Sequence, residues 1–406
     1  MGQAIERTVE SEAGHSYRLA LAAGQYVRVE IFQYWQNVIT RLFDPAGKLV
    51  CEVKLRSDNG QTERLSAVAE QTGDYRLEIK TVTSGSLRRG HYVVTWTQQR
   101  AVTAQDHTLV EADRLQLTAY ALAQKEPKSE EAIKLSEKGL ALYEQVYGTT
   151  HQELLETLKL LAGLQERRAN HPAAEALYRR ALAIGETTLG RDHLVVAELW
   201  SRLGDLDQFR ARYATAKPAR AEALRIREKL LKPDDLRLAE AIFEWGITLR
   251  YLNDFAQADV SLRRSLSIWE EKLGTQDPST LRVVQELAAL YASKGDYGKA
   301  EPLFERLVAT LEQRAVESRQ LASALLNLGR VNVDLGNVSR AEPHIRRALA
   351  MFEKLTGKES ADTASALALL GRVSAQQKNH AEAEAAYRRA LAIREKLFGP
   401  DNNLTG

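Results

Sequence analysis

Pairs of adjacent arginines are the feature of this sequence best suited to hold a ligand. They recur as Arg179–Arg180, Arg263–Arg264, Arg346–Arg347 and Arg388–Arg389. Two neighbouring guanidinium groups could bind an anion such as a phosphate or a carboxylate. Acidic residues lie a few positions from each pair, however, and opposite charges three or four residues apart pair along a helix surface. We therefore expect a solvated helix face here rather than an anion site.

The histidines and the single cysteine offer little metal or nucleophile chemistry. His151 and His193 open successive stretches of helical pattern at equivalent places, and we interpret both as structural helix starts. Cys51 is the only cysteine, which excludes an internal disulfide and a zinc site built on cysteines. It alternates with charged neighbours in "KLVCEV", as a small buried residue of a strand would. We expect no metal and no cofactor.

Patterns of the common catalytic sites are missing from the sequence. It contains no G-x-S-x-G, no H-E-x-x-H, no glycine-rich phosphate loop and no C-x-x-C pair. We therefore expect a protein that is not an enzyme, with any catalytic domain lying outside this chain.

Composition narrows the class of protein further. The 406 residues include 56 basic and 54 acidic side chains, for a net charge of +2, and no block of like charges suggests a nucleic-acid partner. No apolar run is long enough to span a bilayer, and polar residues follow Met1 directly. We expect no membrane insertion and a cytoplasmic location, or a secreted or periplasmic one if a leader has been removed.

The first hundred residues alternate apolar and polar side chains with a period of two. The clearest examples are "SYRLAL", "YVRVEIF", "VITRLF", "KLVCEV", "YRLEIK" and "YVVTW", and turn sequences such as "DPAG" separate them. About eight short strands with one apolar face predict an all-β, jelly-roll-like sandwich over residues 1–100.

From residue 104 to 399 the pattern is helical and repeats about every 42 residues. One column of small residues reads Ala132, Ala174, Ala216, Ala258, Ala300, Ala341 and Ala383. A second column reads Ala162, Gly204, Gly246, Ala288, Gly329 and Gly371. Two such columns predict two closely packed helices per unit and an all-α superhelix of about seven units. Residues 400–406 look like the start of a further unit that is cut short.

The columns resemble the tetratricopeptide repeat (TPR), whose usual period is 34 residues. Here the second helix continues through stretches such as "RALAIREKLFG", and units begin with polar segments such as "TQDPSTL". This longer form resembles the repeats of kinesin light chains and their bacterial relatives. The resemblance implies a scaffold for protein–protein interaction.

The segments "GHSYRLALAAGQYVRVEI", "LFDPAGKL" and "TGDYRLEI" resemble the pre-peptidase C-terminal-like β-sandwich that precedes such repeats in large bacterial proteins. In that architecture a caspase-like CHAT protease domain often follows the repeats. The resemblance implies that this chain corresponds to the N-terminal part of such a protein.

In repeats of this kind the first helix of each unit faces the concave side, so its exposed positions form one stripe. In the first two units the stripe contains Glu156, Lys159, Glu166, Arg167, Glu198, Ser201, Asp205 and Phe209. We expect peptide-binding contacts further along it, at Phe243, Ile247, Arg250, Tyr251, Asn327, Arg330 and Arg372. The apolar residues would anchor the ligand and the arginines would hold its acidic end. Alternatively, the aromatic residues pack into the neighbouring unit.

Two functions remain open at this point. The first is a non-catalytic scaffold that holds a protein or peptide segment in its concave groove. The second is the sensor or regulatory part of a CHAT-type protease effector. A weaker alternative is carbohydrate or calcium binding by the sandwich, although no acidic cluster has calcium-ligand spacing.

Overall fold

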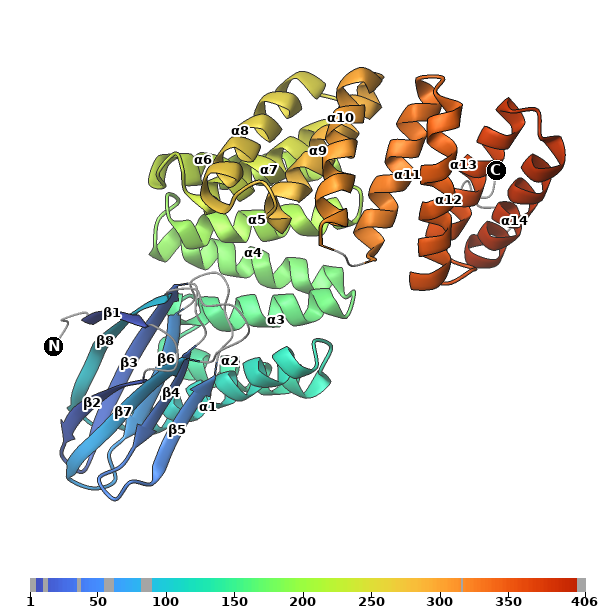
Figure 1. Ribbon diagram of the computed structural model, residues 1–406. Coiled ribbons are helices and arrows are strands. Elements are labelled where there is room, and N and C mark those ends of the chain that lie inside the picture. Colours follow the sequence, from blue (N-terminus) through green and yellow to red (C-terminus); the bar gives the residue numbers. More distant parts are fainter. Residues whose placement is uncertain are drawn as a thin grey trace. The chain divides into compact units, whose positions relative to one another are not determined.

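The computed structural model describes residues 5–9, 14–34, 38–54, 62–81, 90–314 and 317–399. Within them, eight strands are followed by fourteen α-helices, as the sequence predicts (Figure 1). The chain divides into two compact bodies, which we call the N-terminal body (residues 1–206) and the C-terminal body (residues 207–406). The expected further repeat at residues 400–406 lies outside the described residues. No helix in the described residues is long and apolar enough to cross a membrane.

Two four-stranded antiparallel sheets form the sandwich of the N-terminal body. The strands are β1 (Ile5–Val9), β2 (Gly14–Leu21), β3 (Gln25–Tyr34), β4 (Val38–Phe43), β5 (Leu49–Lys54), β6 (Thr62–Val68), β7 (Gly73–Thr81) and β8 (Gly90–Ala101). One sheet has the order β1-β8-β3-β6 and the other β2-β7-β4-β5. Six of these strands contain the alternating segments quoted from the sequence. The other two, β1 and β6, alternate less clearly.

Around Arg28, strand β3 is buried on both of its faces. Val27, Val29 and Ile31 point into the core between the sheets and have no exposed surface. Because side chains alternate along a strand, Arg28 points the other way. It is nevertheless only 3% exposed, because helices cover that face of the sheet. An arginine in this position needs a partner from those helices.

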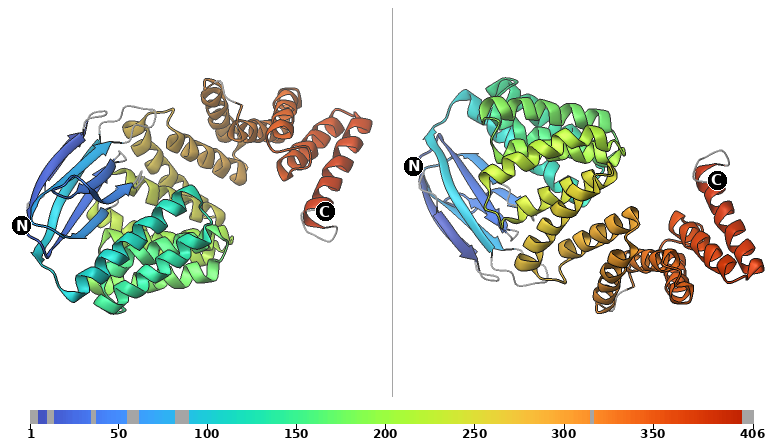
Figure 2. Two further views of the ribbon diagram at one scale, coloured as in Figure 1. Left: turned by 90° about the horizontal axis from the view of Figure 1, so that it is seen from below. Right: turned by 90° about the horizontal axis from the view of Figure 1, so that it is seen from above.

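Paired antiparallel helices make up the rest of the described residues (Figures 1 and 2). The N-terminal body contains α1 (Ala104–Lys125), α2 (Glu130–Tyr147), the 3₁₀ turn η1 (Gln152–Leu154), α3 (Leu155–Arg167), α4 (His171–Thr188) and most of α5 (Leu194–Phe209). The C-terminal body contains α6 (Tyr213–Leu230), α7 (Leu236–Tyr251), α8 (Phe255–Leu273), α9 (Pro278–Lys294), α10 (Tyr297–Glu312), α11 (Arg319–Asp334), α12 (Val338–Leu355), α13 (Ala361–Gln376) and α14 (His380–Phe398).

Small residues of both columns lie where helices meet, and all of them are buried. A Cβ atom added at Gly329 would lie 2.5 Å from Cγ1 of Ile345 on α12, and one at Gly246 would lie 2.9 Å from Leu262 on α8. At Gly371 it would lie 3.1 Å from the ring of Tyr387 on α14. At these positions the close approach of the two helices leaves no room for a side chain.

A left-handed residue ends the first helix of successive units at a spacing of about 42 residues. The positions are Ala169, Ala211, Asn253, Gly295, Gly336 and Lys378, with φ between 54° and 81°. Only two of the six are glycine, the residue that adopts this conformation without strain. For this reason the repeat in the turns is much harder to see in the sequence than the columns of small residues.

Candidate functional site

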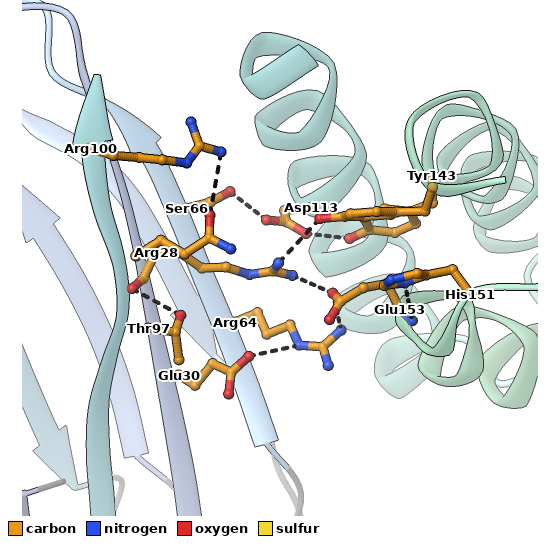
Figure 3. Close-up of polar contacts among 12 residues, drawn as sticks. Arg28, Glu30, Arg64, Ser66, Thr97, Arg100, Asp113, Tyr143, His151 and Glu153 are labelled. Carbon is orange, nitrogen blue, oxygen red and sulfur yellow. Dashed lines mark hydrogen bonds and ion pairs between the residues drawn. The ribbon is translucent and has the colours of Figure 1, made fainter. Parts of the chain in front are cut away.

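A buried cluster of charges joins the sandwich to the first helices (Figure 3). Arg28 of β3 donates to Glu153 of η1 over 2.7 Å, and Arg64 of β6 lies 3.0 Å from the same carboxylate. The side chain of Arg28 is 4% exposed and that of Glu153 is 13% exposed. The Glu153 carboxylate thus bridges two arginines that face the helices from neighbouring strands, and Glu30 lies 3.4 Å from Arg64 as a second acidic partner.

A second contact of the same joint is made by Asp113 of α1, which is buried. Its carboxylate accepts hydrogen bonds from the hydroxyls of Ser66 on β6 and Tyr143 on α2. Burial and the neighbouring Asp113 raise the pKa of Tyr143 well above its usual value. The Tyr143 hydroxyl therefore stays protonated and remains a donor at any physiological pH.

Beside this joint lies a cavity of about 300 Å³, which we call the joint cavity. One lining residue, Arg64, comes from β6, and the others come from η1 and the first five helices. They are Arg64, Asp113, Gln116, Leu117, Tyr120, Ala123, Gln124, Tyr143, Glu153, Glu156, Thr157, Lys159, Leu160, Gly163, Glu166, Arg167, Tyr178, Glu198 and Arg202. The sandwich and the helical repeats therefore contribute to one hollow within the N-terminal body.

Lys159 is the most enclosed cation of the joint cavity. Its side chain is 14% exposed, and its Nζ lies 3.1 Å from Glu156 and 2.8 Å from Glu198. Burial alone would lower the pKa of Lys159, but Glu198 and Glu156 raise it above its usual value. The lysine stays charged and bridges the first helices of two successive repeats, α3 and α5.

Other polar groups of the joint cavity have fewer partners in the chain. Arg167 forms no ion pair within the described residues, and Arg202 lies 3.9 Å from Asp205, at the limit of an ion pair. The amide oxygen of Gln116 is buried and accepts no hydrogen bond within the described residues. Buried polar atoms are nearly always hydrogen-bonded, so an unpaired one in a cavity points to a ligand or a water.

Of the eight stripe residues predicted for the first two units, five line the joint cavity (Glu156, Lys159, Glu166, Arg167 and Glu198), and Ser201, Asp205 and Phe209 do not. Four of them lie on α3, and the 42-residue step relates Glu156 of that helix to Glu198 on α5. Sequence reasoning missed Arg64 and the residues of α1. The segment "TERLSAV" of β6 has Leu65 as its only large apolar residue facing the core, so its alternation is weak. Helix α1 precedes the first complete unit of the small-residue columns.

In the C-terminal body the predicted apolar anchors are buried. Phe243 is 1% exposed and packs 5.5 Å from Trp269 of α8, measured between ring centroids. The guanidinium of Arg282 on α9 covers the same ring at 4.9 Å. Ile247 is 9% exposed. Phe243 therefore packs between neighbouring helices, which was the alternative interpretation, and neither residue offers an open anchor.

Arg250 and Tyr251 form part of a layered stack. Tyr251 is 47% exposed, and its ring lies parallel to that of Tyr213 at 4.1 Å. The guanidinium of Arg250 lies 4.2 Å from the Tyr251 ring and also pairs with Glu286 at 2.9 Å. An exposed aromatic ring held between a second ring and a cation is a rigid surface suited to contacts with a partner.

The remaining predicted contact residues differ in exposure and in whether they already have an ion-pair partner. Asn327 is half-buried and Arg330 is exposed, with no ion pair for Arg330 within the described residues. Arg372 lies 2.7 Å from Asp334 on α11. Arg330 is thus the freer cation of the two.

The adjacent arginine pairs are already neutralised by carboxylates. The first arginine of each pair bonds an acid four residues earlier, as Arg179 does with Glu175 at 3.0 Å. The second arginine reaches the second helix of the preceding unit, as Arg264 does with Glu228 at 2.5 Å. Equivalent bonds join Arg180 to Glu144, Arg306 to Glu270, Arg347 to Glu312 and Arg389 to Glu353. We call this series the arginine ladder, and it gives the outer arginines a structural role.

Among the described residues, no three or more histidine, cysteine, aspartate or glutamate side chains are grouped so that they could hold a metal ion.

Comparison with known families places the chain in a class of repeat proteins. A tetratricopeptide repeat model matches residues 115–187, 244–313 and 320–404, which together exceed half of the chain. A second tetratricopeptide repeat model matches residues 286–353. The chain belongs to the tetratricopeptide repeat family. A comparison with curated proteins gave no significant match.

Solved structures that resemble this chain are distant from it in sequence. The apo form of RapI is 15% identical, with a TM-score of 0.55 over 71% of this chain and 98% of that one. A signal transduction ATPase from Pyrococcus horikoshii with a TPR sensor is 13% identical, with a TM-score of 0.55 over 70% of this chain and 43% of that one. BtubC (BKLC) from P. vanneervenii is 22% identical, with a TM-score of 0.46 over 63% of this chain and 94% of that one.

Proposed function

We propose that this chain is a non-catalytic binding module that holds a segment of another protein in the joint cavity, which would form part of a concave binding groove along the repeats. The observation that carries the proposal is the joint cavity itself, lined by first-helix residues of successive repeats. In a helical solenoid these helices form the concave binding surface. The sandwich adds Arg64 to the same lining, so it serves as part of the site as well as a cover for α1.

The polar groups of the joint cavity suit an extended peptide better than a flat protein surface. Exposed side chains with few partners in this chain can bind the termini and side chains of a peptide. The amide of Gln116 can form a hydrogen bond with the backbone of that peptide. In the C-terminal body, we propose Arg250, Tyr251, Asn327, Arg330 and Arg372 as a second contact surface. Its aromatic stack and the free charge of Arg330 support it, and Phe243 and Ile247 are left out because they are buried.

The proposal is tested by site-specific photo-crosslinking. A photoreactive residue replaces Gln124, which is exposed and lines the joint cavity. The full chain is then irradiated in an extract of its source cells and the captured segments are sequenced. We expect one or a few peptide segments, captured reproducibly.

Two further variants show whether capture depends on the joint cavity. Gly163→Phe places a ring in the cavity, because an added Cβ there meets only the Tyr178 hydroxyl, at 3.9 Å. Gly298→Phe is the control, since nothing lies within 4 Å of its added Cβ on α10. Capture should be lost in the first variant and kept in the second. Equal capture by both would refute a binding role for the cavity.

A second candidate is that the module is the sensor part of a larger effector, of the CHAT protease kind. Its support is the order of the elements, a sandwich joined by buried charges to kinesin-light-chain-like repeats, which resembles the pre-peptidase-like arrangement. A TPR region also serves as a sensor in the Pyrococcus horikoshii ATPase that shares the fold. The gene sequence downstream of residue 406 tests this candidate. An α/β domain with a histidine and a cysteine in catalytic positions would support it.

A further inference from the structure

Helix α14 has one face that the rest of the described residues leaves uncovered. In α8, α10 and α12 the corresponding face packs against the first helix of the following unit, whereas α14 packs chiefly against α13. Tyr387 of α14 is accordingly 44% exposed. The equivalent position is at most 3% exposed in each of the six other second helices, where it holds Ser136, Tyr178, Arg220, Leu262, Phe304 and Ile345.

This face carries one continuous line of side chains, which we call the α14 stripe. It consists of Glu384, Tyr387, Leu391, Arg394 and Phe398. Spacings that alternate between three and four residues place side chains on one side of a helix, as in the seam of two paired helices. The three apolar members are between 40% and 44% exposed. Apolar side chains gathered on one exposed helix face are typical of a contact surface.

The charges of the α14 stripe indicate what kind of partner fits it. Arg394 is half-buried and forms no ion pair within the described residues, although the equivalent positions of the three preceding units hold the buried apolar residues Trp269, Leu311 and Phe352.

Glu384, toward the other end of the stripe, is exposed and pairs at 2.7 Å with Arg388 on the surface of its own helix. The stripe therefore has an acid toward its start, a cation toward its end and apolar side chains between them. Such a surface is complementary to itself when it is turned end to end.

We infer that two copies of this chain associate through α14, with the two helices antiparallel. When Arg394 lies opposite the partner's Glu384, Leu391 lies opposite the partner's Tyr387, because both pairs are centred on position 389. One register thus satisfies the charges and the apolar side chains together, and two-fold symmetry forms each contact twice. Consecutive helices of the repeats are antiparallel, so the partner's helix takes the direction that a following first helix takes elsewhere in the chain. The inference does not depend on the joint cavity.

Sedimentation equilibrium of the full chain measures this association directly. A pair of helices is a small interface, so we expect a dimer that forms between about 1 and 100 µM. Leu391→Glu puts a charge in the middle of the α14 stripe and should weaken association at least tenfold. Val260→Glu is the matched control, because Val260 is 68% exposed on α8, and it should leave association unchanged. Circular dichroism confirms that both variants keep their helix content.

Two charge variants test the antiparallel register. In a dimer of Arg394→Glu two acids face each other at both contacts, and in a dimer of Glu384→Arg two cations do. Each variant alone should therefore associate at least tenfold more weakly than the wild type. In an equal mixture, a dimer of one chain of each kind has opposite charges at both contacts. We expect the mixture to associate about as strongly as the wild type.

A chain that stays monomeric at the highest of these concentrations would overturn the inference, and so would equal losses from Leu391→Glu and Val260→Glu. Failure of the mixed charge variants to associate would also overturn it, because α14 would then pair in another register or with another partner. Amide exchange in α14 should slow as the protein concentration rises, and exchange that is independent of concentration would count against the dimer. None of these results bears on photo-crosslinking at the joint cavity, so the proposed function is tested separately.

Discussion

At the scale of single residues, packing between helices depends on positions that tolerate no side chain. Gly329 is such a position, because an added Cβ would lie 2.5 Å from Ile345. Gly163, also inside a helix, has its closest contact at 3.9 Å. We expect Gly329→Leu to cost about 1–3 kcal/mol through overpacking, with Gly329→Ala affected less strongly. Gly163→Ala should be neutral or stabilise by about 0.5–1 kcal/mol, because alanine favours helix. Urea unfolding compares the variants, and equal effects at the two sites would contradict the packing argument.

Asp106 of α1 forms an ion pair with Arg100, near the end of the last strand of the sandwich. Burial would raise the pKa of this carboxyl, but hydrogen bonds from Arg100, at 2.6 and 2.7 Å, and from Thr103 hold it at about 2. Because the folded pKa lies below the unfolded value near 4, the bond stabilises the fold fully above pH 4. That contribution is lost as the pH falls from 4 to 2.

Asp106→Asn should therefore lower the free energy of unfolding at pH 6 by about 2 kcal/mol, the equivalent of almost two pKa units. The difference from the wild type should narrow steadily between pH 4 and pH 2. Denaturant midpoints measured at several pH values provide the check. Asp74→Asn is the control, since its ion pair with Arg18 is exposed on both sides. A constant gap across this pH range would show that charge is not what Asp106 contributes.

At the scale of elements, the arginine ladder connects the second helices of neighbouring repeats. Arg306 of α10 lies 2.5 Å from Glu270 of α8, and both side chains are about one third exposed. Arg306→Glu places two like charges together and should cost about 1 kcal/mol. The exchanged pair Glu270→Arg with Arg306→Glu should recover most of that loss. A double-mutant cycle on thermal unfolding measures the coupling, and additive effects would mean that the ladder bond contributes nothing.

The joint between the sandwich and the helices is a stronger connection, because its charges are buried. Glu153→Gln would leave Arg28, whose side chain is 4% exposed, without its carboxylate. We expect a loss of about 3 kcal/mol in the stability of the N-terminal body. Glu130→Gln removes an exposed partner of Lys134 and should cost less than about 0.5 kcal/mol. If chemical denaturation gave the two variants equal stability, the joint would not hold the sandwich in place.

The elements also show how far the sequence alone could go. Period-two alternation located six strands, and the 42-residue period put Glu156, Lys159 and Glu198 on a shared surface. Both signals are local and repeated, so one sequence suffices to read them. The role of Arg64 depends on Glu153, which is 89 positions away on another element, and nothing near Arg64 in the sequence indicates that partner. Phe243 shows a different limit of the sequence. The 42-residue period places it on the first helix of its unit, but the period does not reveal that Trp269 and Arg282 cover its ring.

At the scale of the whole molecule, a chain of repeats that touch mainly their neighbours is expected to open in parts before it unfolds completely. In the N-terminal body, buried charges tie β3 and β6 to α1 and η1, so these elements should open together. In the C-terminal body, α14 packs chiefly against α13, and few tertiary contacts have to break for this pair to open. Native-state hydrogen exchange should therefore show slow, shared protection in β3, β6 and α1, and faster exchange in α14.

The same measurement on Glu153→Gln tests whether the joint is the cause of that shared protection. Removing the carboxylate should speed exchange in β3, β6 and α1 together, because Arg28 and Arg64 lose the group that holds both strands to η1. Protection in α11–α14 should not change, since these helices belong to the other compact body. Faster exchange in α1 alone would mean that the sandwich is held by other contacts. A uniform rise across all helices would mean that the chain unfolds as one cooperative unit, which would contradict the division into locally opening repeats.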